Sequence, residues 1–238
     1  MHASPLELPT YDVVIPCHNR AHVVADAVAS VLAQDPAPRR VIVVDDGSSD
    51  DSAAVIRALA ADHGSVEAMI LPRNGGASNA RNAGVALCAA PWVAFLDSDD
   101  VWLPGAAHAL LASTAHLDIV VGQFGRVEGD AAPSAPECGW DGRDIRRALA
   151  SGGVIGPSWS IVRRSMVMAI GGFDPSFHNC NDWDFYTRAA ADGARFGRVD
   201  ATVALYRTVA GDRLVNDHAL GAVNAGRVLA HPYLAELA

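Results

Sequence analysis

The sequence predicts an α/β fold in which helices flank a mainly parallel central sheet. Short, uninterrupted apolar runs such as 93–96 (VAFL) recur along the first half of the chain, and such runs are typical of strands buried on both faces. Segments with apolar residues at helical spacing separate these runs. Strands that alternate with helices in this way form a parallel sheet with right-handed crossovers. Polar residues follow each run, so a parallel sheet would gather them at one edge.

Proline residues mark several element boundaries in the first half of the chain. Pro16 ends the first expected strand, because proline cannot donate to a sheet ladder. Pro36 and Pro38 stop the first expected helix. The expected strands cover residues 11–16, 40–46, 66–71 and 93–97, and the expected helices between them cover residues 21–34, 51–61 and 77–89.

The second half of the chain has less regular patterning. Residues 128–144 contain scattered prolines and glycines, which is typical of a long loop. The final helix, over residues 214–229, would lie across the sheet or against a partner subunit, so a homodimer is one arrangement that it allows. The other expected elements are helices over 101–115, 143–150 and 164–170, a helix that opens within 178–184 and ends at 191, and strands over 117–124, 156–162 and 194–206.

The composition argues against several classes of protein. The chain of 238 residues is 50% hydrophobic and 19% charged, as expected of a globular protein. Its net charge of −9 argues against a general nucleic-acid binder, since no basic stripe offsets it. No apolar run approaches the ~18–20 residues that cross a bilayer, so no transmembrane segment is expected.

The cysteines and the N-terminus indicate the compartment. Cys17, Cys88, Cys138 and Cys180 are widely scattered and form no C-x-x-C pair, so neither a zinc site nor a disulfide framework is suggested. The first ten residues lack the basic region and apolar core of a signal peptide. These features predict a cytoplasmic protein with reduced thiols.

Three carboxylates follow the apolar run at 93–96. Asp97, Asp99 and Asp100 would lie at the carboxyl end of a buried strand, the edge at which open α/β sheets bind ligands. Acids so close together repel one another unless a cation lies among them, and Mg²⁺ or Mn²⁺ prefers oxygen ligands. The alternative is an acidic turn that caps the next helix, with Pro104 in its first turn. The acids alone do not decide between a metal site and a helix cap.

Four motifs along the first hundred or so residues have a recognisable order. They are VVIPCHNR (13–20), VIVVDDGSSDDS (41–52), RNGGASNARNAG (73–84) and FLDSDD (95–100). In order and spacing they resemble the motifs of glycosyltransferase family 2. The resemblance implies the GT-A fold, an A-type, Rossmann-like fold that uses nucleotide-diphosphate sugars. It implies a single GT-A domain over residues 1–238, with a nucleotide-binding half (11–104), an acceptor half (105–213) and a C-terminal helical tail (214–238).

The resemblance assigns roles to residues after the first two expected strands. Pro16, His18 and Arg20 would lie beside the nucleotide base and ribose. Asp46 would accept a hydrogen bond from a ring N–H of the base, which suits a carboxylate because it only accepts when ionised. The alternative role for Asp46 is to cap the turn before Gly47.

The resemblance also assigns roles around the acidic stretch. Arg81 matches a basic residue near the nucleotide, and its alternative role is that of an ordinary exposed helix arginine. Asp97 and Asp99 match the family's aspartate–any–aspartate pair, the DXD motif. In that pair the first acid contacts the ribose, and the second holds Mn²⁺ or Mg²⁺ on the diphosphate. Asp100 either assists this pair or caps the following helix.

In the acceptor half, Asp182 matches the family's catalytic base. A base is needed because an acceptor hydroxyl is a poor nucleophile until its proton is removed. The alternative is that Asp182 caps a helix, whose dipole stabilises a carboxylate at its start. Asp184 would orient Arg188 or the acceptor, or serve the structure alone. Trp159 is a further auxiliary candidate on the acceptor side.

Two positions depart from the family pattern. Asn181 stands where the family typically has glutamate, which removes one charge beside the expected base. Residues 205–213 (LYRTVAGDR) match the family's tyrosine–arginine strand end, but the histidine often found just after it is absent. His218 is close in sequence, yet its spacing does not match. Both departures bear on metal dependence and activity more than on the fold.

The function that these patterns predict is that of an inverting glycosyltransferase. It would move a sugar from a UDP- or dTDP-linked donor to an acceptor hydroxyl, with metal assistance and with Asp182 as base. One alternative is a sugar-1-phosphate nucleotidyltransferase, but PCHNR occupies the place where such enzymes have a glycine-rich basic loop. An alternative from another class is a non-catalytic protein that binds sugar nucleotides, which Asn181 and the missing histidine would suit.

Overall fold

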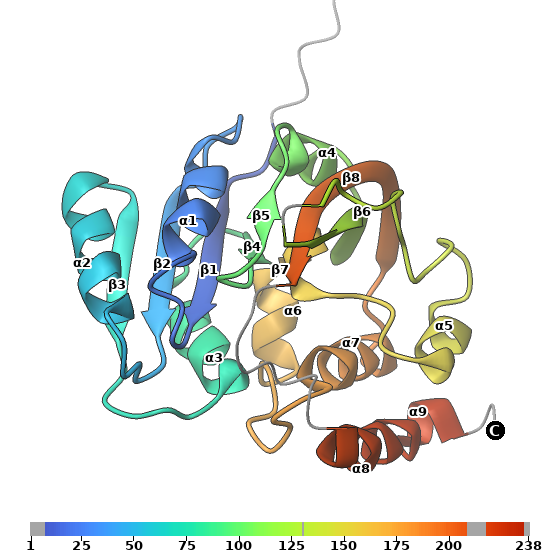
Figure 1. Ribbon diagram of the computed structural model, residues 1–238. Helices are drawn as coiled ribbons and strands as arrows, with labels where there is room; N and C mark the ends of the chain where they lie inside the picture. The colour runs from blue at the N-terminus through green and yellow to red at the C-terminus, as the bar shows by residue number, and fades with distance from the viewer. Residues whose placement is uncertain (1–7, 130, 209–217, 236–238) are drawn as a thin grey trace, which may run out of the picture.

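A twisted sheet runs through the middle of the molecule and carries helices on both faces (Figure 1). The computed structural model describes residues 8–129, 131–208 and 218–235. Within these residues the sheet has eight strands in the order β3-β2-β1-β4-β7-β6-β8-β5. The strands are β1 (Tyr11–Cys17), β2 (Arg40–Asp45), β3 (Val66–Ile70), β4 (Trp92–Phe95), β5 (Val101–Trp102), β6 (Ile119–Glu128), β7 (Ser160–Arg163) and β8 (Phe196–Thr208).

Most of the described strands point the same way, as the sequence predicted. β1 pairs in parallel with β2 and β4, and β2 pairs in parallel with β3. β7 runs antiparallel to β4 and β6, which makes β6 and its parallel neighbour β8 point the same way as β4. Short β5 closes the edge antiparallel to β8. The carboxyl ends of β1, β2 and β4 therefore lie side by side, where ligands bind in open α/β sheets.

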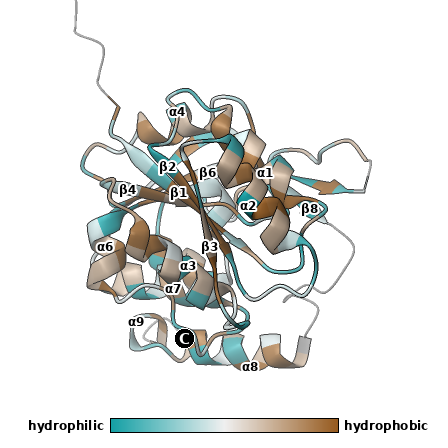
Figure 2. Cartoon of the chain, turned by 90° about the vertical axis from the view of Figure 1, so that its left-hand side faces the viewer, coloured by the Kyte–Doolittle hydropathy of each residue, from teal (hydrophilic) through white to brown (hydrophobic). Residues whose placement is uncertain are grey.

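The helices lie in two layers. The helices are α1 (Val24–Leu32), α2 (Ser52–Asp62), α3 (Ala77–Leu87), α4 (Ala106–Leu111), α5 (Ile145–Ser151), α6 (Arg164–Ala169), α7 (Asn181–Ala191), α8 (His218–Leu229) and α9 (Pro232–Ala235), with a 3-10 turn η1 (Pro157–Trp159). α1 and α4 pack on one face of the sheet, and α3, α6 and α7 pack on the other (Figures 1 and 2).

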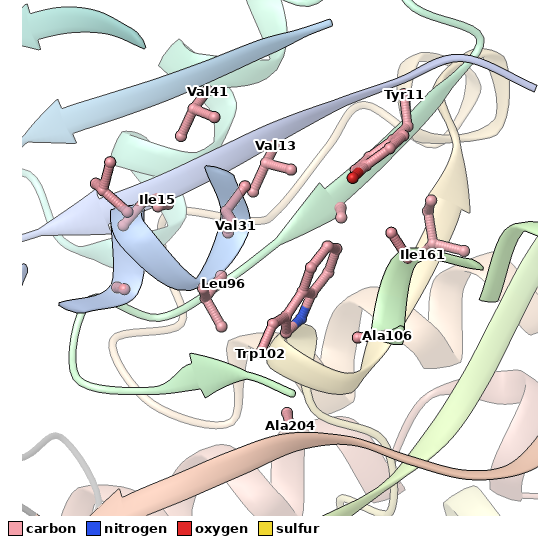
Figure 3. Close-up of a cluster of buried hydrophobic side chains, with 14 of the residues drawn as sticks. Tyr11, Val13, Ile15, Val31, Val41, Leu96, Trp102, Ala106, Ile161 and Ala204 are labelled. Carbon is pink, nitrogen blue, oxygen red and sulfur yellow. The ribbon is translucent and has the colours of Figure 1, made fainter. Parts of the chain in front are cut away.

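Alternate residues of β1 point to opposite faces and so join two separate cores. Val13 and Ile15 pack with α1 in the first core, part of which Figure 3 shows, while Val14 packs with α3 in the second. Each of these side chains is 0% exposed. Burying an aliphatic side chain of this size is worth about 1.5–3 kcal/mol. The strand is buried on both faces, which explains its uninterrupted apolar sequence.

Two expected elements were wrong in their local structure. The helix expected over 101–115 begins only at Ala106, because Val101 and Trp102 pair with β8 instead. The first part of the strand expected over 156–162 is the 3-10 turn η1. In both places a long-range contact overrides the local pattern: Trp102 donates its indole N–H to the Ser158 carbonyl oxygen at 2.8 Å.

The C-terminal helix is present, with different bounds. α8 begins at His218, and residues 214–217 of the expected helix lie outside the described residues. The same is true of residues 209–213 in the LYRTVAGDR stretch. α8 packs beneath α7, far from the sheet edge formed by β3 (Figure 1).

Candidate active site

A pocket of about 310 Å³ opens at the carboxyl ends of β1, β2 and β4. It is lined from both halves of the chain: loops after the parallel strands form one side, and η1 with the start of α7 forms the other. Most residues that the sequence singled out line it, although they are far apart in the chain. They are Pro16, His18, Arg20, Asp46, Arg81, Asp97, Asp99, Trp159 and Asp182.

His18 fastens three loops at the entrance of the pocket. Its Nδ1 lies 2.9 Å from the Asp46 carbonyl oxygen, which can only accept, so Nδ1 carries the proton. The amide groups of Asn19 and Asn74 approach Nε2 at 3.2 and 3.0 Å. Their oxygens accept from the backbone N–H groups of Ser49 and Gly76, so their NH₂ groups face the imidazole. Both ring nitrogens of His18 are therefore engaged in hydrogen bonds, and the residue lines the pocket.

Asp46 joins the loop after β2 to the loop before α3. Its two carboxylate oxygens accept from the backbone N–H groups of Gly75 at 2.9 Å and Gly76 at 2.7 Å. The two loops touch so closely that a Cβ on Gly47 would lie 2.5 Å from the Arg73 carbonyl carbon, and Gly47 has a positive φ of 64°. A carboxylate oxygen has two lone pairs, so Asp46 holds the loops and still has acceptor capacity toward the pocket.

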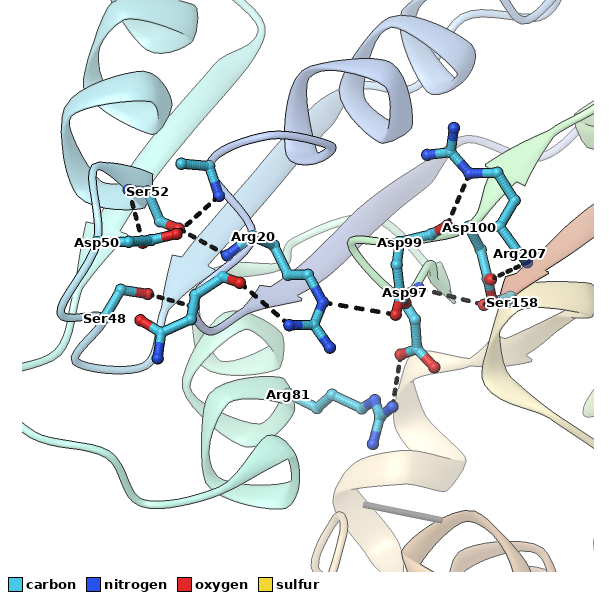
Figure 4. A network of polar contacts seen from close by, with 12 residues as sticks. Arg20, Ser48, Asp50, Ser52, Arg81, Asp97, Asp99, Asp100, Ser158 and Arg207 are labelled. Carbon is cyan, nitrogen blue, oxygen red and sulfur yellow. Dashed lines mark hydrogen bonds and ion pairs between the residues drawn. The ribbon is translucent and has the colours of Figure 1, made fainter. Parts of the chain in front are cut away.

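Arg20 and Asp99 form an ion pair at the pocket (Figure 4). The Arg20 Nε lies 3.5 Å from the Asp99 Oδ2, and the two side chains are 14% and 15% exposed. Arg20 also donates from Nη1 to the Asn19 carbonyl oxygen at 3.0 Å. A separation of 3.5 Å is longer than that of a charge-assisted hydrogen bond, so this contact is an ion pair and not a hydrogen bond.

Arg81 connects the acidic stretch to the start of α7. It donates from Nη2 to Asp97 Oδ1 at 2.6 Å and from Nη1 to Asn181 Oδ1 at 2.9 Å. Its guanidinium also lies over the Phe173 ring, 5.1 Å from the centroid. The Arg81 side chain is only 5% exposed. It is therefore a buried connector between two halves of the site and not an ordinary exposed helix arginine.

Asp100 points away from the pocket and is 1% exposed. It accepts from the Ser158 hydroxyl at 2.6 Å and from the Arg207 backbone N–H at 3.0 Å (Figure 4). Burial raises the pKa of the Asp100 carboxyl well above its usual range, and the carboxylates of Asp97 and Asp99 add to this shift. The role that the structure supports for Asp100 is to tie the acidic turn to η1 and β8.

Ser158 is a site residue that sequence reasoning missed. Its hydroxyl donates to Asp100 and accepts from the Asp97 backbone N–H at 3.2 Å. It is 0% exposed. No local pattern marks a serine for this task, because both of its partners lie about sixty residues earlier in the chain.

Asp182 lies in the first turn of α7 and lines the pocket. Its Oδ1 accepts from the Trp183 backbone N–H at 2.8 Å. Burial raises the pKa of the Asp182 carboxyl, and the Asp97 carboxylate adds to the rise, while the Trp183 N–H and the Arg81 charge lower it. A carboxylate with a raised pKa in a pocket is suited to take up a proton.

Asp184 does not line the pocket. It is 6% exposed and pairs with Arg188 one turn later on α7, at 2.8 Å. Arg188 in turn donates to the carbonyl oxygens of Ile170 and Gly172. Of the roles expected for Asp184, the structure shows the contact with Arg188, and this contact serves the structure because it fixes α7 against the turn after α6.

The loop before Asp182 is fastened from outside by α8. Asn224, which is 1% exposed, donates from Nδ2 to Asn179 Oδ1 at 2.7 Å and to the Asn179 carbonyl oxygen at 3.3 Å. Arg227 donates to the hydroxyl and the carbonyl of Ser176, and lies 3.8 Å from the centroid of the Phe177 ring. These contacts hold the segment from which α7 starts.

Aromatic residues form one wall of the pocket. Trp159 stacks on Phe124 with 4.0 Å between ring centroids and meets Tyr206 edge-on at 6.3 Å. Trp159 and Tyr206 line the pocket. The indole lies so close to Gly156 that a Cβ there would be 2.2 Å from the ring. Glycine at position 156 thus lets an aromatic surface face the site.

The pocket contains carboxylates suited to a divalent cation, without a preformed cage. Among the described residues, no three His, Cys, Asp or Glu side chains group as a metal site. Asp99 offers a partly exposed carboxylate. Mg²⁺ and Mn²⁺ are commonly held by one or two carboxylates together with substrate phosphates. The oxygen donors present therefore fit a cation that binds together with a diphosphate.

The sequence comparison agrees with this geometry. A family model described as "Glycosyl transferase family 2" matches residues 12–171, which is most of the chain. The chain belongs to glycosyltransferase family 2. It is 32% identical over 201 residues to the succinoglycan biosynthesis protein ExoU of Rhizobium meliloti, which covers 77% of this chain and 58% of ExoU. It is 31% identical to the uncharacterized glycosyltransferase YwdF of Bacillus subtilis, over 82% of this chain and 72% of YwdF.

Solved structures confirm the GT-A fold of this family 2 chain. S. aureus TarS 1-349 in complex with UDP-GlcNAc superposes with a TM-score of 0.73 at 19% identity, covering 95% of this chain and 71% of that one. The mannosyltransferase PcManGT of Pyrobaculum calidifontis, in complex with GDP-Man and Mn²⁺, gives a TM-score of 0.65 at 20% identity, over 85% and 58%. The chain thus spans a little over half the length of ExoU and PcManGT.

In the described parts of this family 2 chain, no helix is both long enough and apolar enough to cross a bilayer.

Proposed function

We propose that the chain is an inverting glycosyltransferase that uses a nucleotide-diphosphate sugar and has Asp182 as its general base. The observation that carries the proposal is that Asp182 lines the same pocket as Asp97 and Asp99. The acidic turn and the start of α7 are more than eighty residues apart, and Arg81 bonds to both of them. A donor site and a base in one cavity are what a single displacement requires.

The loops after the parallel strands would bind the nucleotide. Pro16 and the ring face of His18 would lie beside the base and ribose, together with Arg20. Asp46 would use its spare acceptor capacity for a ring N–H of the base, which favours uridine or thymidine. The complexes of TarS with UDP-GlcNAc and of PcManGT with GDP-Man support a sugar nucleotide as the donor.

Asp97 and Asp99 would contact different parts of the donor, the ribose and the diphosphate. Asp97, held by Arg81, would contact the ribose, and Asp99 would hold Mn²⁺ or Mg²⁺ against the diphosphate oxygens. A divalent cation there would offset the negative charge that builds on the leaving diphosphate. Arg20 lies beside Asp99 and brings a second positive charge to the same place.

Asp182 would remove the proton from the acceptor hydroxyl while that oxygen attacks the anomeric carbon. The bond from that carbon to the diphosphate oxygen breaks on the opposite side, so the configuration at the carbon inverts. The nucleoside diphosphate leaves with the bonding electron pair, and the proton ends on Asp182. One positioned carboxylate typically contributes about 10²–10⁴-fold to such a rate.

The proposal is tested by binding and turnover together. A thermal-shift screen of nucleotide sugars selects the donor, and calorimetry with UDP and dTDP, with and without Mn²⁺, measures binding. We expect tighter binding with Mn²⁺, slow donor hydrolysis, and transfer to an acceptor with inversion by NMR. Tight binding without turnover on any acceptor would instead support a non-catalytic sugar-nucleotide-binding protein. Formation of a sugar nucleotide from a sugar 1-phosphate would support a nucleotidyltransferase.

A further inference from the structure

The side-chain amide of Asn181 has a fixed orientation. Its Oδ1 accepts from Arg81 Nη1 at 2.9 Å. A guanidinium has only donors, so the oxygen of the amide must face Arg81 and the NH₂ group must point elsewhere. Arg81 is itself held in place by Asp97 at 2.6 Å and by the Phe173 ring. The buried guanidinium of Arg81 therefore fixes the direction of the Asn181 NH₂ group.

The N–H groups of the Asn181 side chain are available for a further hydrogen bond. Asn181 is 7% exposed and lines the pocket. Within the part of the chain that the structure describes, no group accepts a hydrogen bond from its Nδ2. Nδ2 does not belong to the buried side-chain atoms that lack a partner, so this donor is accessible although the residue as a whole is nearly buried. An oxygen of a molecule bound in the pocket can therefore accept a hydrogen bond from it.

The next residue presents the opposite chemistry. Asp182 is a carboxylate that only accepts when ionised, and it lines the same pocket. Asn181 and Asp182 thus place a hydrogen-bond donor beside an acceptor at the start of α7. Two adjacent hydroxyl groups match this pair, because one donates its proton to Asp182 while the oxygen of its neighbour accepts from Asn181.

We propose that Asn181 is a specificity-determining residue that selects acceptors with a hydroxyl next to the reacting one, as in a sugar ring. The inference rests on the proposed function, in which Asp182 activates the reacting hydroxyl. An alcohol with an isolated hydroxyl would satisfy Asp182 and leave the Asn181 donors unpaired. A site that hydrogen-bonds a substrate hydroxyl rejects the analogue that lacks it, because its own polar group then stays buried and unpaired.

The test compares acceptors that differ by one hydroxyl. The probes are the methyl pyranosides of glucose, galactose and mannose, with 1-octanol as the isolated alcohol. For the glycoside that reacts fastest, two monodeoxy analogues follow: one lacks the hydroxyl next to the reacting position, and the other lacks a remote hydroxyl. For the unaltered protein, we expect loss of the adjacent hydroxyl to lower kcat/KM about tenfold or more, and loss of the remote one to lower it less.

Variants of Asn181 assign this discrimination to its NH₂ group. In Asn181→Ala we expect the penalty for the missing adjacent hydroxyl to fall to about twofold or less, while affinity for the donor nucleotide is kept. Asn181→Asp keeps an oxygen for Arg81 but has no NH₂ group, so it should lose the discrimination as well. Asn74→Ala is the matched control, because it removes a pocket asparagine on the nucleotide side and should keep the discrimination.

Two results would overturn the inference. One is an unchanged penalty for the missing adjacent hydroxyl in both Asn181 variants, with melting temperatures showing that they fold. The other is transfer to 1-octanol that equals or exceeds transfer to every glycoside. A chain that binds no nucleotide sugar would refute the proposed function itself, and this inference with it, so donor calorimetry separates the two failures.

Discussion

The two sides of the pocket treat their polar groups differently. On the nucleotide side every acid has a fixed partner: Asp46 accepts from two backbone N–H groups, Asp97 from Arg81, and Asp99 pairs with Arg20. On the α7 side, among the residues that the structure describes, Asp182 accepts from the N–H of its neighbour Trp183, and no group accepts from the NH₂ group of Asn181.

This difference matches two different tasks, which are binding the donor and taking up a proton from the acceptor. Groups that hold a ligand work best when their positions are already fixed, because little freedom is then lost on binding. A group that takes up a proton must instead have a pKa that lets it do so, and burial with few partners raises the pKa of Asp182. The nucleotide side is thus organised for binding, and the α7 side is organised for chemistry.

The largest expected effect comes from Asp182→Asn. We expect transfer to fall about 10²–10⁴-fold, because the acceptor hydroxyl loses its base. Donor affinity should stay unchanged, because the nucleotide side is untouched. Initial rates and calorimetry on the same preparation measure the two quantities. If the variant also binds the donor poorly, the assignment of donor binding to the nucleotide side and of proton transfer to Asp182 is wrong.

Asp99→Ala should show the converse pattern. Loss of a charged ligand is expected to weaken donor binding in Mn²⁺ about 10–100-fold. Without the metal, the variant and the unaltered protein should bind the donor with similar affinity. Titrations of UDP at several Mn²⁺ concentrations measure this. Equal weakening in the presence and absence of Mn²⁺ would show that Asp99 acts through its ion pair with Arg20 alone.

Asn224→Leu tests whether a residue outside the pocket positions the α7 side without affecting the nucleotide side. It removes the two hydrogen bonds that Asn179 accepts from Asn224, by which α8 holds the loop before Asp182. We expect a loss of about 1–3 kcal/mol in stability and a lower transfer rate, with donor affinity kept. Val228→Ala is the control, because it weakens the same helix through packing alone. If both variants lose transfer rate in the same proportion to the stability that they lose, Asn224 has no positioning role.

The smallest effect concerns pH. The pKa of Asp182 is raised in the fold, so kcat/KM should fall on acidification with an apparent pKa above the ordinary aspartate value of about 3.9. The same shift means that ionised Asp182 destabilises the fold as pH rises through its folded pKa. Asp182→Asn should therefore melt at a higher temperature than the unaltered protein near neutral pH, and the difference should vanish below about pH 4. Melting curves across pH test this, and a gap that widens on acidification would contradict the sign.

The nucleotide side could be predicted from sequence because its signals are contiguous. Each apolar strand is followed directly by the polar residues that it positions, so convergence at one edge of the sheet follows from the parallel order alone. His18, Asp46 and Asp99 were placed in this way, and all three line the pocket.

The other side depended on contacts between distant residues. Ser158 and Asp100 form a hydrogen bond because η1 packs against the acidic turn, and no sequence pattern near either residue predicts this contact. The pairing of Val101 with Leu205 placed the start of an expected helix in a short strand for the same reason. Asn181 could be recognised as a departure from the family, but the direction of its amide needed Arg81 in place.

The packing of Trp159 against Gly156 gives the protein an intrinsic optical reporter. Of its five tryptophans, Trp92, Trp102, Trp140 and Trp183 are between 2% and 8% exposed, whereas Trp159 is less buried and faces the cavity. Ultraviolet emission from the unlabelled chain should therefore change mainly through this one indole when a ligand enters, and replacing it with phenylalanine would silence the signal. Occupancy could then be followed in real time, without a radioactive sugar or a coupled enzyme.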